Sequence, residues 1–346
     1  MNVSILKQER KLAVDVDAVC RLILDTQLPS GEIPWSEGDK TDPWDHTEAA
    51  MGLVVGGYLK KARQAFDWLR ANQLADGSWY SAYRKGVPED KTRETNMSAY
   101  VAVGVFHYWL ITKDRGFLET MWETVRRGVD FAVSHQSANG EIYWAVSPQG
   151  KVDRMALLTG SSSIYMSLKC AMAIAAELGM ATLPWAEALD RLGDAICSRP
   201  TLFNMTKSRF SMDWFYPVLC GAVTGEEANR RIERHWKKYV VEGLGVRCVS
   251  DQPWVTIAES SELVLALAAM GDVKKAHFVF NWLSEHVFED GSFWCGFTFP
   301  DMTRWPVEKI TWTNAVVLMA ADALFDLTPA SRLFSHAWWA QAGFPG

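Results

Sequence analysis

The chain has 346 residues, of which 49% are hydrophobic, and a formal net charge of −6 at pH 7. This acidic balance argues against a nucleic-acid partner, because binding a phosphate backbone requires a basic surface. No stretch approaches the roughly 18 uninterrupted apolar residues of a membrane span, and residues 1–11 lack the apolar centre of a signal peptide. Six cysteines without a CxxC pair are typical of reduced thiols. We therefore expect a cytoplasmic protein.

Apolar segments of helical periodicity alternate six times with charged amphipathic ones. The apolar segments cover 44–58, 95–110, 160–179, 211–223, 256–271 and 311–324. The amphipathic segments cover 5–27, 60–73, 115–136, 184–199, 225–241 and 272–288. This alternation predicts an all-α (α/α)6 toroid, with six inner and six outer helices, as a single domain over 1–346. A closed double ring implies a central cavity with one loop of each repeat at its mouth.

Four connections between helices share a glycine followed by an aromatic residue: 27–35, 73–79, 136–144 and 287–294. Glycine supplies the left-handed conformation that ends a helix. The closing residues are Trp35, Trp79, Trp144 and Trp294. We expect these tryptophans to pack back onto their repeats as structural staples.

The first mouth loop, 39–50, contains Trp44, Asp45, His46 and Glu48. Asp45 is placed to cap the following helix, and acidic residues are favoured in a first turn. A structural and a catalytic role therefore both remain open for Asp45 and Glu48. His46 has no capping role, so we expect a proton carrier or a hydrogen-bond donor to substrate. Trp44 is a candidate for stacking on a substrate.

The next three mouth loops combine arginines, acids and aromatics. Gly160 and the serines at 161–163 begin the third inner helix, where they serve either as an ordinary cap or as a site for an anion or a sugar hydroxyl. The fourth loop places Asp213 beside three aromatics, as a further candidate acid. The candidate substrate-binding residues of these loops are Arg93, Arg154, Arg209, Trp214 and Tyr216.

The fifth loop and its helix, 247–262, carry the densest set of candidates. Glu259 and Glu262 lie three residues apart, on one face of an otherwise apolar helix. Burying two acids there is costly without a partner or a function, so we expect catalytic roles for both. Asp251 is a third candidate acid, and Arg247 and Trp254 are candidate substrate-binding residues.

The sixth mouth loop, 299–314, supplies one more candidate acid, Glu308. Its candidate substrate-binding residues are Arg304, Trp305 and Trp312. Five of the six loops thus contain an arginine. These arginines either form salt bridges between loops or face inward, in which case the substrate is an anion such as a diphosphate or a uronate.

The Q-x-x-x-G-x-W turn at 73–79, repeated in variants on a helical ring, resembles the terpenoid cyclase and protein prenyltransferase superfamily. The resemblance covers the whole chain as architecture. The Asp-x-Asp-Asp acid of class II cyclases and the Asp-rich magnesium motif of class I synthases are both absent. Cys248 and Asp251 are close in sequence, but no histidine follows to complete a prenyltransferase-like zinc site. We therefore expect no metal and no cofactor.

The same ring also resembles the six-hairpin glycosidases, which include inverting hydrolases and uronyl hydrolases. These enzymes place paired carboxylates and stacking tryptophans on the loops that lead into inner helices. Tryptophan can stack on a sugar or on a carbocation, so the aromatic content does not separate the two resemblances.

The turn motif favours a terpenoid-cyclase-like or prenyltransferase-like enzyme, using carboxylate acid chemistry on an isoprenoid or another anionic substrate. The alternative is an inverting six-hairpin glycoside hydrolase or uronyl hydrolase acting on a small saccharide. A third hypothesis is a non-catalytic toroid that binds a ligand.

The aromatic extension at 329–346 has two interpretations: a contact with a membrane interface or packing against the protein, which its low positive charge favours. The sequence carries no signal for the oligomeric state.

Overall fold

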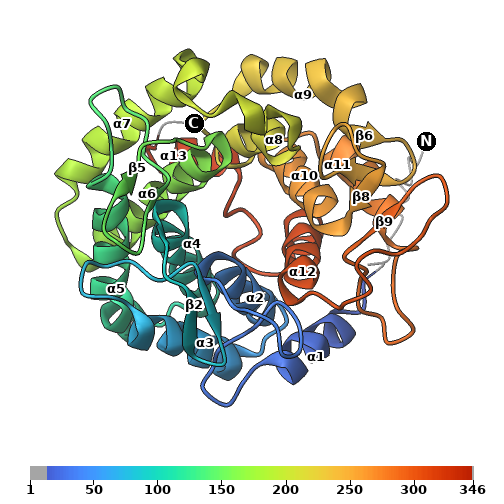
Figure 1. Cartoon of the computed structure of the whole chain (residues 1–346), viewed down its shortest axis with the longest axis horizontal. Coiled ribbons are helices and arrows are strands. Elements are labelled where there is room, and N and C mark those ends of the chain that lie inside the picture. Colours follow the sequence, from blue (N-terminus) through green and yellow to red (C-terminus); the bar gives the residue numbers. More distant parts are fainter. Residues whose placement is uncertain (1–13, 345–346) are drawn as a thin grey trace, which may run out of the picture.

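The computed structural model describes residues 14–344 and forms the expected (α/α)6 toroid (Figure 1). Residues 5–13 of the first predicted helix and the last two residues of the extension lie outside the described part. The inner helices are α2 (Pro43–Val55), α4 (Thr95–Thr112), α6 (Leu158–Leu178), α8 (Met212–Leu219), α10 (Ile257–Ala269) and α12 (Thr311–Phe325). The outer helices are α1 (Val16–Thr26), α3 (Leu59–Asn72), α5 (Arg115–Val133), α7 (Leu183–Ser198), α9 (Gly225–Tyr239) and α11 (Val273–Leu283).

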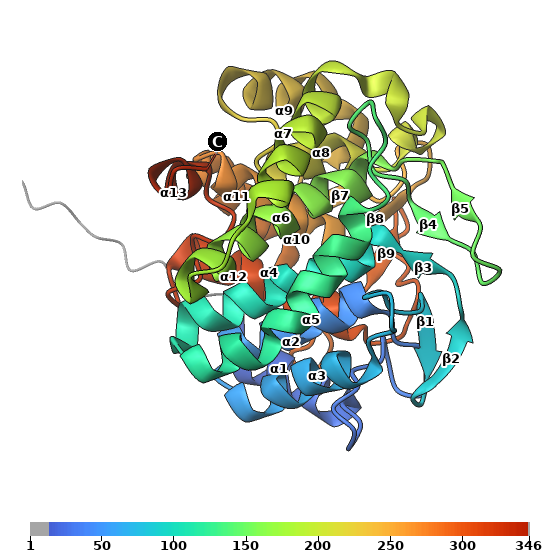
Figure 2. The same ribbon diagram turned by 90° about the vertical axis from the view of Figure 1, so that its left-hand side faces the viewer.

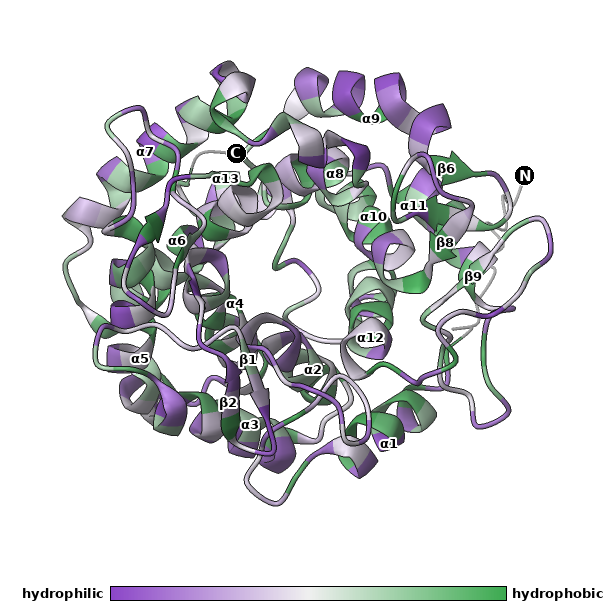
Figure 3. Ribbon diagram, viewed as in Figure 1, coloured by the Kyte–Doolittle hydropathy of each residue, from purple (hydrophilic) through white to green (hydrophobic). Residues whose placement is uncertain are grey.

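Polarity separates the two rings (Figure 3). In α4, fourteen of eighteen residues are buried, because both its sides pack against other helices. In α9, three of fifteen residues are buried, Ala228, Ile232 and Tyr239, and its charged face meets solvent. An element that is apolar all round belongs in an interior, and one with an apolar stripe belongs on a surface. The assignment of inner and outer helices from the sequence is therefore confirmed.

The inner helix expected over 211–223 is shorter than predicted and ends at Leu219. Gly221 adopts a left-handed conformation, with φ of +72°, and stops the helix. A side chain at this position would also meet the buried Lys169 ammonium at 2.9 Å.

The glutamine and glycine of the repeated turns join successive outer helices. Each glutamine Nε2 donates to the carbonyl of the glycine four residues on and to a carbonyl of the next outer helix. The pairs of acceptors are Gly31 and Lys61 for Gln27, Gly77 and Thr124 for Gln73, and Gly140 and Ala188 for Gln136. The three glycines have φ between +94° and +104°. The motif is thus a device for building the ring.

Short antiparallel strands surround the end of the ring where the inner helices begin, which we call the mouth (Figure 2). They form three small sheets that the sequence analysis did not predict. The strands are β1 (Ala82–Arg84), β2 (Val87–Asp90), β3 (Arg93–Glu94), β4 (Ala145–Val146), β5 (Val152–Asp153), β6 (Val240–Val241), β7 (Gly245–Arg247), β8 (Trp254–Thr256) and β9 (Gly296–Thr298). Two 3₁₀ turns, Pro200–Leu202 and Met205–Arg209, complete the connection before α8.

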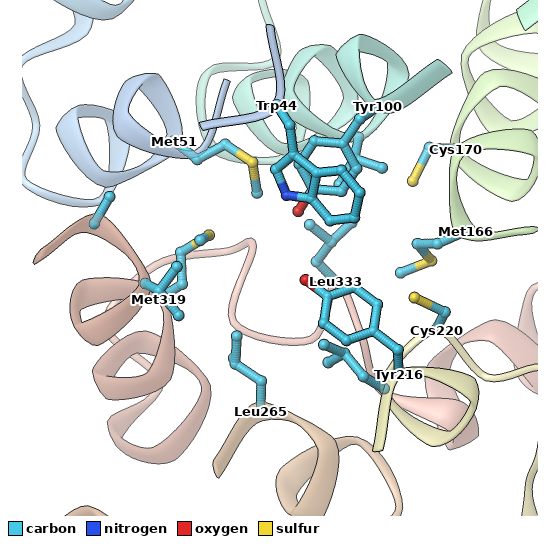
Figure 4. Close-up of a cluster of buried hydrophobic side chains, with 14 of the residues drawn as sticks. Trp44, Met51, Tyr100, Met166, Cys170, Tyr216, Cys220, Leu265, Met319 and Leu333 are labelled. Carbon is cyan, nitrogen blue, oxygen red and sulfur yellow. The ribbon is translucent and has the colours of Figure 1, made fainter. Parts of the chain in front are cut away.

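The aromatic extension packs at the opposite end of the ring, where it forms α13 (His336–Gln341) (Figure 2). Trp339 is fully buried and donates through Nε1 to the Leu333 carbonyl at 2.6 Å. The Lys169 ammonium lies 4.8 Å from the centre of the Trp339 ring. Figure 4 shows Leu333 among inner-ring side chains such as Met319 and Met166. The extension therefore docks on the protein and fills this end of the ring with side chains.

Within residues 14–344, no helix combines the length and the apolar character needed to cross a membrane.

Candidate active site

A pocket of about 290 Å³ opens at the mouth, among the first turns of the six inner helices. One set of lining residues is acidic: Asp42, Asp45, Glu48, Glu259 and Glu262. A second set is aromatic: Trp35, Trp44 and Trp312. The remainder are Asn96, Met97, Leu157, Thr159, Gly160 and Met212. The described residues that line the pocket include no arginine and no lysine.

The start of α2 places three carboxyl groups along one side of this pocket. Asp42, and not Asp45 as expected, is the N-cap, because its Oδ1 accepts from the Asp45 backbone N–H at 2.9 Å. Pro43 then begins the helix, where its missing N–H costs nothing. Asp45 is released from capping and, with Glu48 one turn further on, faces the pocket.

The surroundings of Asp45 favour its protonated form. Burial raises the pKa of this carboxyl well above its ordinary value, and the negative charges of Asp42 and Glu48 raise it further. Burial also raises the pKa of Asp42, although hydrogen bonds from the Asp45 N–H and from the Trp35 indole oppose this shift. Lys40 is the cation that acts on both groups, and its effect is the smallest of the causes. Asp45 can therefore carry a proton near neutral pH.

Glu48 is held deeper in the pocket by two donors. Its Oε1 accepts from the Trp44 indole at 2.8 Å and from the Tyr100 hydroxyl at 3.0 Å. The Trp44 and Tyr100 rings stack at 4.8 Å between centroids, and Figure 4 shows both projecting into the ring. Burial raises the pKa of Glu48 to about 7, and the two hydrogen bonds limit the rise.

Helix α10 presents Glu259 and Glu262 from another part of the ring. The Tyr216 hydroxyl donates to Glu262 Oε1 at 2.5 Å, whereas Oε2 of Glu262 is buried without a hydrogen-bond partner. Burial raises the pKa of Glu262 well above its ordinary value, as do the charges of Glu48 and Glu259. A side-chain hydrogen bond joins Cys248 to Glu259, and burial together with this carboxylate raises the pKa of the thiol.

The two acidic helices carry their carboxyl groups at the same positions counted from the helix start. Asp45 and Glu259 are each the third residue of their helix, and Glu48 and Glu262 are each the sixth. At 1.5 Å per residue, the two levels are about 4.5 Å apart along each helix. Helix α12 packs against both α2 and α10 and lies between them. The pocket therefore has an outer pair of carboxyls, Asp45 and Glu259, and an inner pair held by tyrosines.

Of the four turn tryptophans, Trp79 is a staple as expected, because it is buried and donates to the Leu69 carbonyl at 2.8 Å. Trp35 lines the pocket instead. Its indole donates to Asp42 Oδ2 at 2.7 Å, and its ring lies 6.3 Å from that of Trp312. The expectation that Trp35 serves only as a staple is therefore wrong.

His46 faces away from the pocket, toward α3. The Ile33 N–H donates to Nδ1 at 3.0 Å, and Nε2 lies 3.0 Å from the Ala65 carbonyl. Burial lowers the pKa of this histidine to about 4. Both ring nitrogens are occupied, so the predicted proton carrier is a neutral packing residue.

Asp213 and Trp214 also lie outside the pocket lining. Asp213 accepts from the Thr159 hydroxyl at 2.6 Å and from its N–H at 3.2 Å, and so satisfies the first turn of α6. Trp214 stacks on Tyr239 at 5.0 Å and donates to the Arg231 carbonyl at 2.9 Å. By contrast, Tyr216 reaches the pocket carboxyl of Glu262, as described above.

The five mouth arginines lie apart from the pocket lining. Arg93 forms an ion pair with Asp76, and Arg209 forms one with the candidate acid Asp251, at 2.8 Å. Arg247 donates to the Ser250 carbonyl at 3.1 Å and lies 5.1 Å from the Phe299 ring centre. Arg304 lies 5.2 Å from the centres of the Phe288 and Trp294 rings. Arg154 is exposed, on β5's edge of the mouth. None of these five arginines therefore contributes its charge to the pocket lining.

The rim beyond α10 carries the remaining candidates. Trp254 and Trp305 meet edge to face at 5.2 Å, and the Trp254 indole donates to the Trp305 carbonyl at 2.8 Å. Trp305 is 59% exposed, and Glu308 beside it is also exposed. Glu308 and Asp251 meet solvent and lie outside the pocket lining, so neither shares the enclosed surroundings of the pocket carboxyls.

The sequence analysis missed seven pocket residues: Trp35, Asp42, Asn96, Met97, Leu157, Thr159 and Met212. Asp42 could have been found, since Asp before Pro at a helix start is a typical N-cap signal. The apolar residues carry no signal of their own, because methionine and leucine in a helix indicate core. Among residues 14–344, no group of three or more His, Cys, Asp or Glu side chains could hold a metal ion.

No protein-family model matches the chain. The fold is that of solved glycosidases. A glycosidase variant in complex with glucose superposes with a TM-score of 0.69 and 15% identity, covering 91% of this chain and 96% of that chain. The GH63 mannosylglycerate hydrolase of Thermus thermophilus superposes with a TM-score of 0.69 and 13% identity, covering 89% and 99%. A D-mannose isomerase gives a TM-score of 0.65 at 12% identity, covering 90% and 96%. The molecule thus has the six-hairpin toroid of glycosidases, with a carboxylate-lined pocket at its mouth.

A curated relative shows the family. The MMP endo-(1,4)-3-O-methyl-α-D-mannosidase of Mycolicibacterium hassiacum is 52% identical over 312 residues, which cover 90% of this chain and 86% of the relative. The chain belongs to the family of this mannosidase and is an enzyme of the glycoside hydrolase class.

The terpenoid cyclase or prenyltransferase function expected from the turn motif is therefore wrong, as is the isoprenoid substrate. The comparisons support the alternative, a six-hairpin glycoside hydrolase acting on a saccharide. The physical reason for the error lies in the motif itself. Its glutamine and glycine connect outer helices and never touch the pocket, so the motif reports on architecture and not on chemistry.

Proposed function

We propose that the protein hydrolyses internal (1,4) bonds between 3-O-methyl-α-D-mannose units of an oligosaccharide or polysaccharide. The observation that carries this proposal is the 52% identity to a mannosidase named for that activity, over 90% of the chain. The pocket agrees with a neutral sugar, because its charged lining residues are acids without an arginine or lysine among them.

Asp45 is the general acid in this proposal. Cleaving a glycosidic bond requires proton donation to the departing oxygen, and the donor must hold a proton near neutral pH. Burial and the charges of Asp42 and Glu48 keep the Asp45 pKa high. The side chain also faces the pocket from the first turn of α2, where an incoming glycosidic oxygen can reach it.

Glu259 is the general base. It lines the same pocket as Asp45 and, like Asp45, is the third residue of its helix, which is separated from α2 by α12. Facing side chains two helices apart leave room for a water molecule beside the sugar, which suits an inverting enzyme with carboxyls roughly 6.5–9.5 Å apart. Glu259 removes a proton from this water, the water oxygen bonds to C1, and the C1–O4 bond breaks as Asp45 protonates O4. The new reducing end has the β configuration.

The inner pair, Glu48 and Glu262, does not react with the sugar in this scheme and acts on the outer pair through charge. Their tyrosine partners hold them in place, and Glu48 contributes to the raised pKa of Asp45. Trp254 and Trp305 extend an aromatic surface from β8, the strand that leads directly into α10. We assign this surface to sugar units beyond the cleaved bond, since an internal cleavage leaves saccharide on both sides.

The experiment compares Asp45→Asn and Glu259→Gln on (1,4)-linked 3-O-methyl-α-mannosides with a poor or a good leaving group. A good leaving group departs without protonation. D45N should therefore lose roughly 10²-fold or more in kcat on the natural glycoside and recover most of it on the dinitrophenyl glycoside. E259Q should lose a similar factor on both substrates. Full activity of either variant on the natural glycoside would overturn the assignment.

Two controls accompany this test. Asp251→Asn removes an exposed acid of the mouth, and its activity should stay near that of the unaltered enzyme. Proton NMR of the first product identifies the anomer. An α product at early times would contradict the inverting mechanism while leaving the substrate assignment intact.

A further inference from the structure

The pocket has two chemically different sides. Its carboxyl groups come from α2, with its N-cap, and from α10, which are neighbours of α12. Across from them, the starts of α4, α6 and α8 contribute Met97, Leu157 and Met212. Figure 1 shows these three helices following one another around the ring. We call these three side chains the apolar wall.

The three residues of the apolar wall stand out from their neighbours by being accessible. Met97, Leu157 and Met212 are each half-buried. In α4 and α8, the side chains next to them, Asn96, Ser98 and Asp213, are buried. An apolar side chain that the fold leaves accessible inside a concave site is available to contact a ligand.

A polar acceptor lies beside the apolar wall. Asn96 is 7% exposed and lines the pocket, and its Oδ1 is buried without a hydrogen-bond partner. The Trp312 indole N–H, also at the pocket, is likewise without a partner. Buried polar atoms normally form hydrogen bonds. We therefore expect a ligand to donate a hydrogen bond to Asn96 Oδ1 and to accept one from the Trp312 indole.

The wall would be a poor site for an unmodified sugar. A free hydroxyl pressed against two thioether side chains and a leucine would lose its hydrogen bonds to water without replacing them. A methyl ether has no O–H to satisfy and presents an apolar methyl group instead. Methionine adapts its shape to such a group because it is unbranched and flexible.

We propose that Met97, Leu157 and Met212 form the subsite for the 3-O-methyl group, and that Asn96 Oδ1 accepts a hydrogen bond from a free hydroxyl next to it on the same ring. This inference rests on the proposed function, and it adds the residues that select methylated over unmethylated mannosides. The acidic side performs the chemistry, and the apolar wall decides which saccharide is held there.

The test measures kcat/KM for two (1,4)-α-mannotetraosides, one with and one without 3-O-methyl groups. The unaltered enzyme should prefer the methylated substrate by roughly tenfold or more, the usual scale for one apolar carbon in a fitted pocket. Met97→Gln, Leu157→Asn and Met212→Gln should each reduce this ratio mainly by weakening cleavage of the methylated substrate. The volume-conserving M97L and L157M should keep the ratio, which separates wall chemistry from misfolding.

A binding measurement keeps the inference separate from the catalytic proposal. In the D45N background, titration with methyl 3-O-methyl-α-D-mannoside and with methyl α-D-mannoside should show tighter binding of the methylated sugar, and M212Q should remove the difference. An unchanged ratio in all three polar variants, with folding intact, would overturn the apolar wall while leaving the hydrolase function standing. An enzyme that cleaves neither tetraoside would overturn both.

Discussion

Asp45, the proposed general acid, shows how a local departure from the expected cap frees a carboxyl group. Capping by Asp42 occupies one carboxylate with the helix N-terminus and leaves the next one, a single turn away, facing the pocket. The negative charge of Asp42 then acts on the pKa of Asp45. Together with burial, which is the larger cause, this negative neighbour raises the pKa of Asp45 and so favours the protonated form that the proposed mechanism needs.

The pH dependence of kcat follows from this arrangement. In the proposed mechanism activity requires protonated Asp45, so kcat should fall as the pH rises through the raised Asp45 pKa. Asp42→Asn retains a good N-cap but removes a negative charge, which lowers the Asp45 pKa. The alkaline limb of the kcat profile should move to lower pH by up to about one unit.

The control for this profile is Asp39→Asn, which removes an acid of the same loop that pairs with Arg84 at 3.4 Å. Its alkaline limb should stay in place. An unmoved limb in D42N, with normal folding, would mean that Asp42 does not set the charge state of the acid.

Glu262 makes a prediction about stability. Its pKa in the folded protein is well above the ordinary value near 4.3. Above that ordinary value the unfolded chain releases the proton while the folded protein keeps it, so stability falls as the pH rises toward the folded pKa. Glu262→Gln removes this loss and leaves an acceptor for Tyr216.

Urea unfolding should therefore show a larger gain in stability for E262Q over the unaltered protein at pH 8 than at pH 4. Glu308→Gln, an exposed acid of the rim, should show no such trend. Equal stability differences at the two pH values would contradict the raised pKa of Glu262.

At the scale of elements, the repeated turn is the clearest case of a glycine fixed by geometry. A Cβ on Gly77 would lie 2.2 Å from the Arg127 carbonyl oxygen, and φ is +94°. Gly57 has a similar φ of +80° but nothing within 4 Å of the same position. Replacing Gly57 by alanine therefore introduces backbone strain alone, whereas replacing Gly77 adds a steric clash.

Gly57→Ala should lower the free energy of unfolding by about 1 kcal/mol, the usual cost of a left-handed alanine. Gly77→Ala should cost clearly more, because the α5 backbone must move away. Urea unfolding of both variants measures the difference. If G77A lowers the free energy of unfolding no more than G57A does, the α5 backbone can move away from the turn at little energetic cost.

Helical periodicity was enough to predict the double ring, since the inner helices are mostly apolar and buried whereas outer helices such as α9 carry a charged face. The mouth strands could not be predicted in the same way, because two to four residues, as in β3 or β2, are too few to show a period of two. Site residues could be predicted where acidic side chains occur in a helix that is otherwise apolar and expected to be buried, as at Glu259 and Glu262. The site was not predictable at Met97 or Met212, whose side chains resemble core residues until the ring is closed.

For the molecule as a whole, the aromatic extension completes the interior. Trp339 is fully buried, its ring lies 5.8 Å from that of Phe106, and its indole is bonded to the chain. None of these residues lines the pocket at the mouth. The extension should therefore matter for stability and little for catalysis.

Trp339→Ala should cost about 3–5 kcal/mol in unfolding free energy, as expected for a buried tryptophan. Its kcat on the methylated tetraoside, measured at low temperature where the variant is folded, should be unchanged. Phe278→Ala, which removes a side chain of α11 that is 52% exposed, is the control and should cost far less. Lost turnover in a folded W339A protein would reveal coupling between the two ends of the ring.

The filling of the far end by the C-terminal extension also restricts how a long substrate can be cut. Leu333 is buried among inner-ring side chains at the far end, so in the proposed mechanism the substrate enters and leaves the toroid through the mouth. Under the proposed function, a polysaccharide is then not threaded through the ring, and both fragments leave by the mouth. Internal cleavage then requires the chain to arch into the opening, with its two arms resting on the rim. The enzyme must let go after each cut, so products of mixed intermediate lengths should accumulate before the shortest ones.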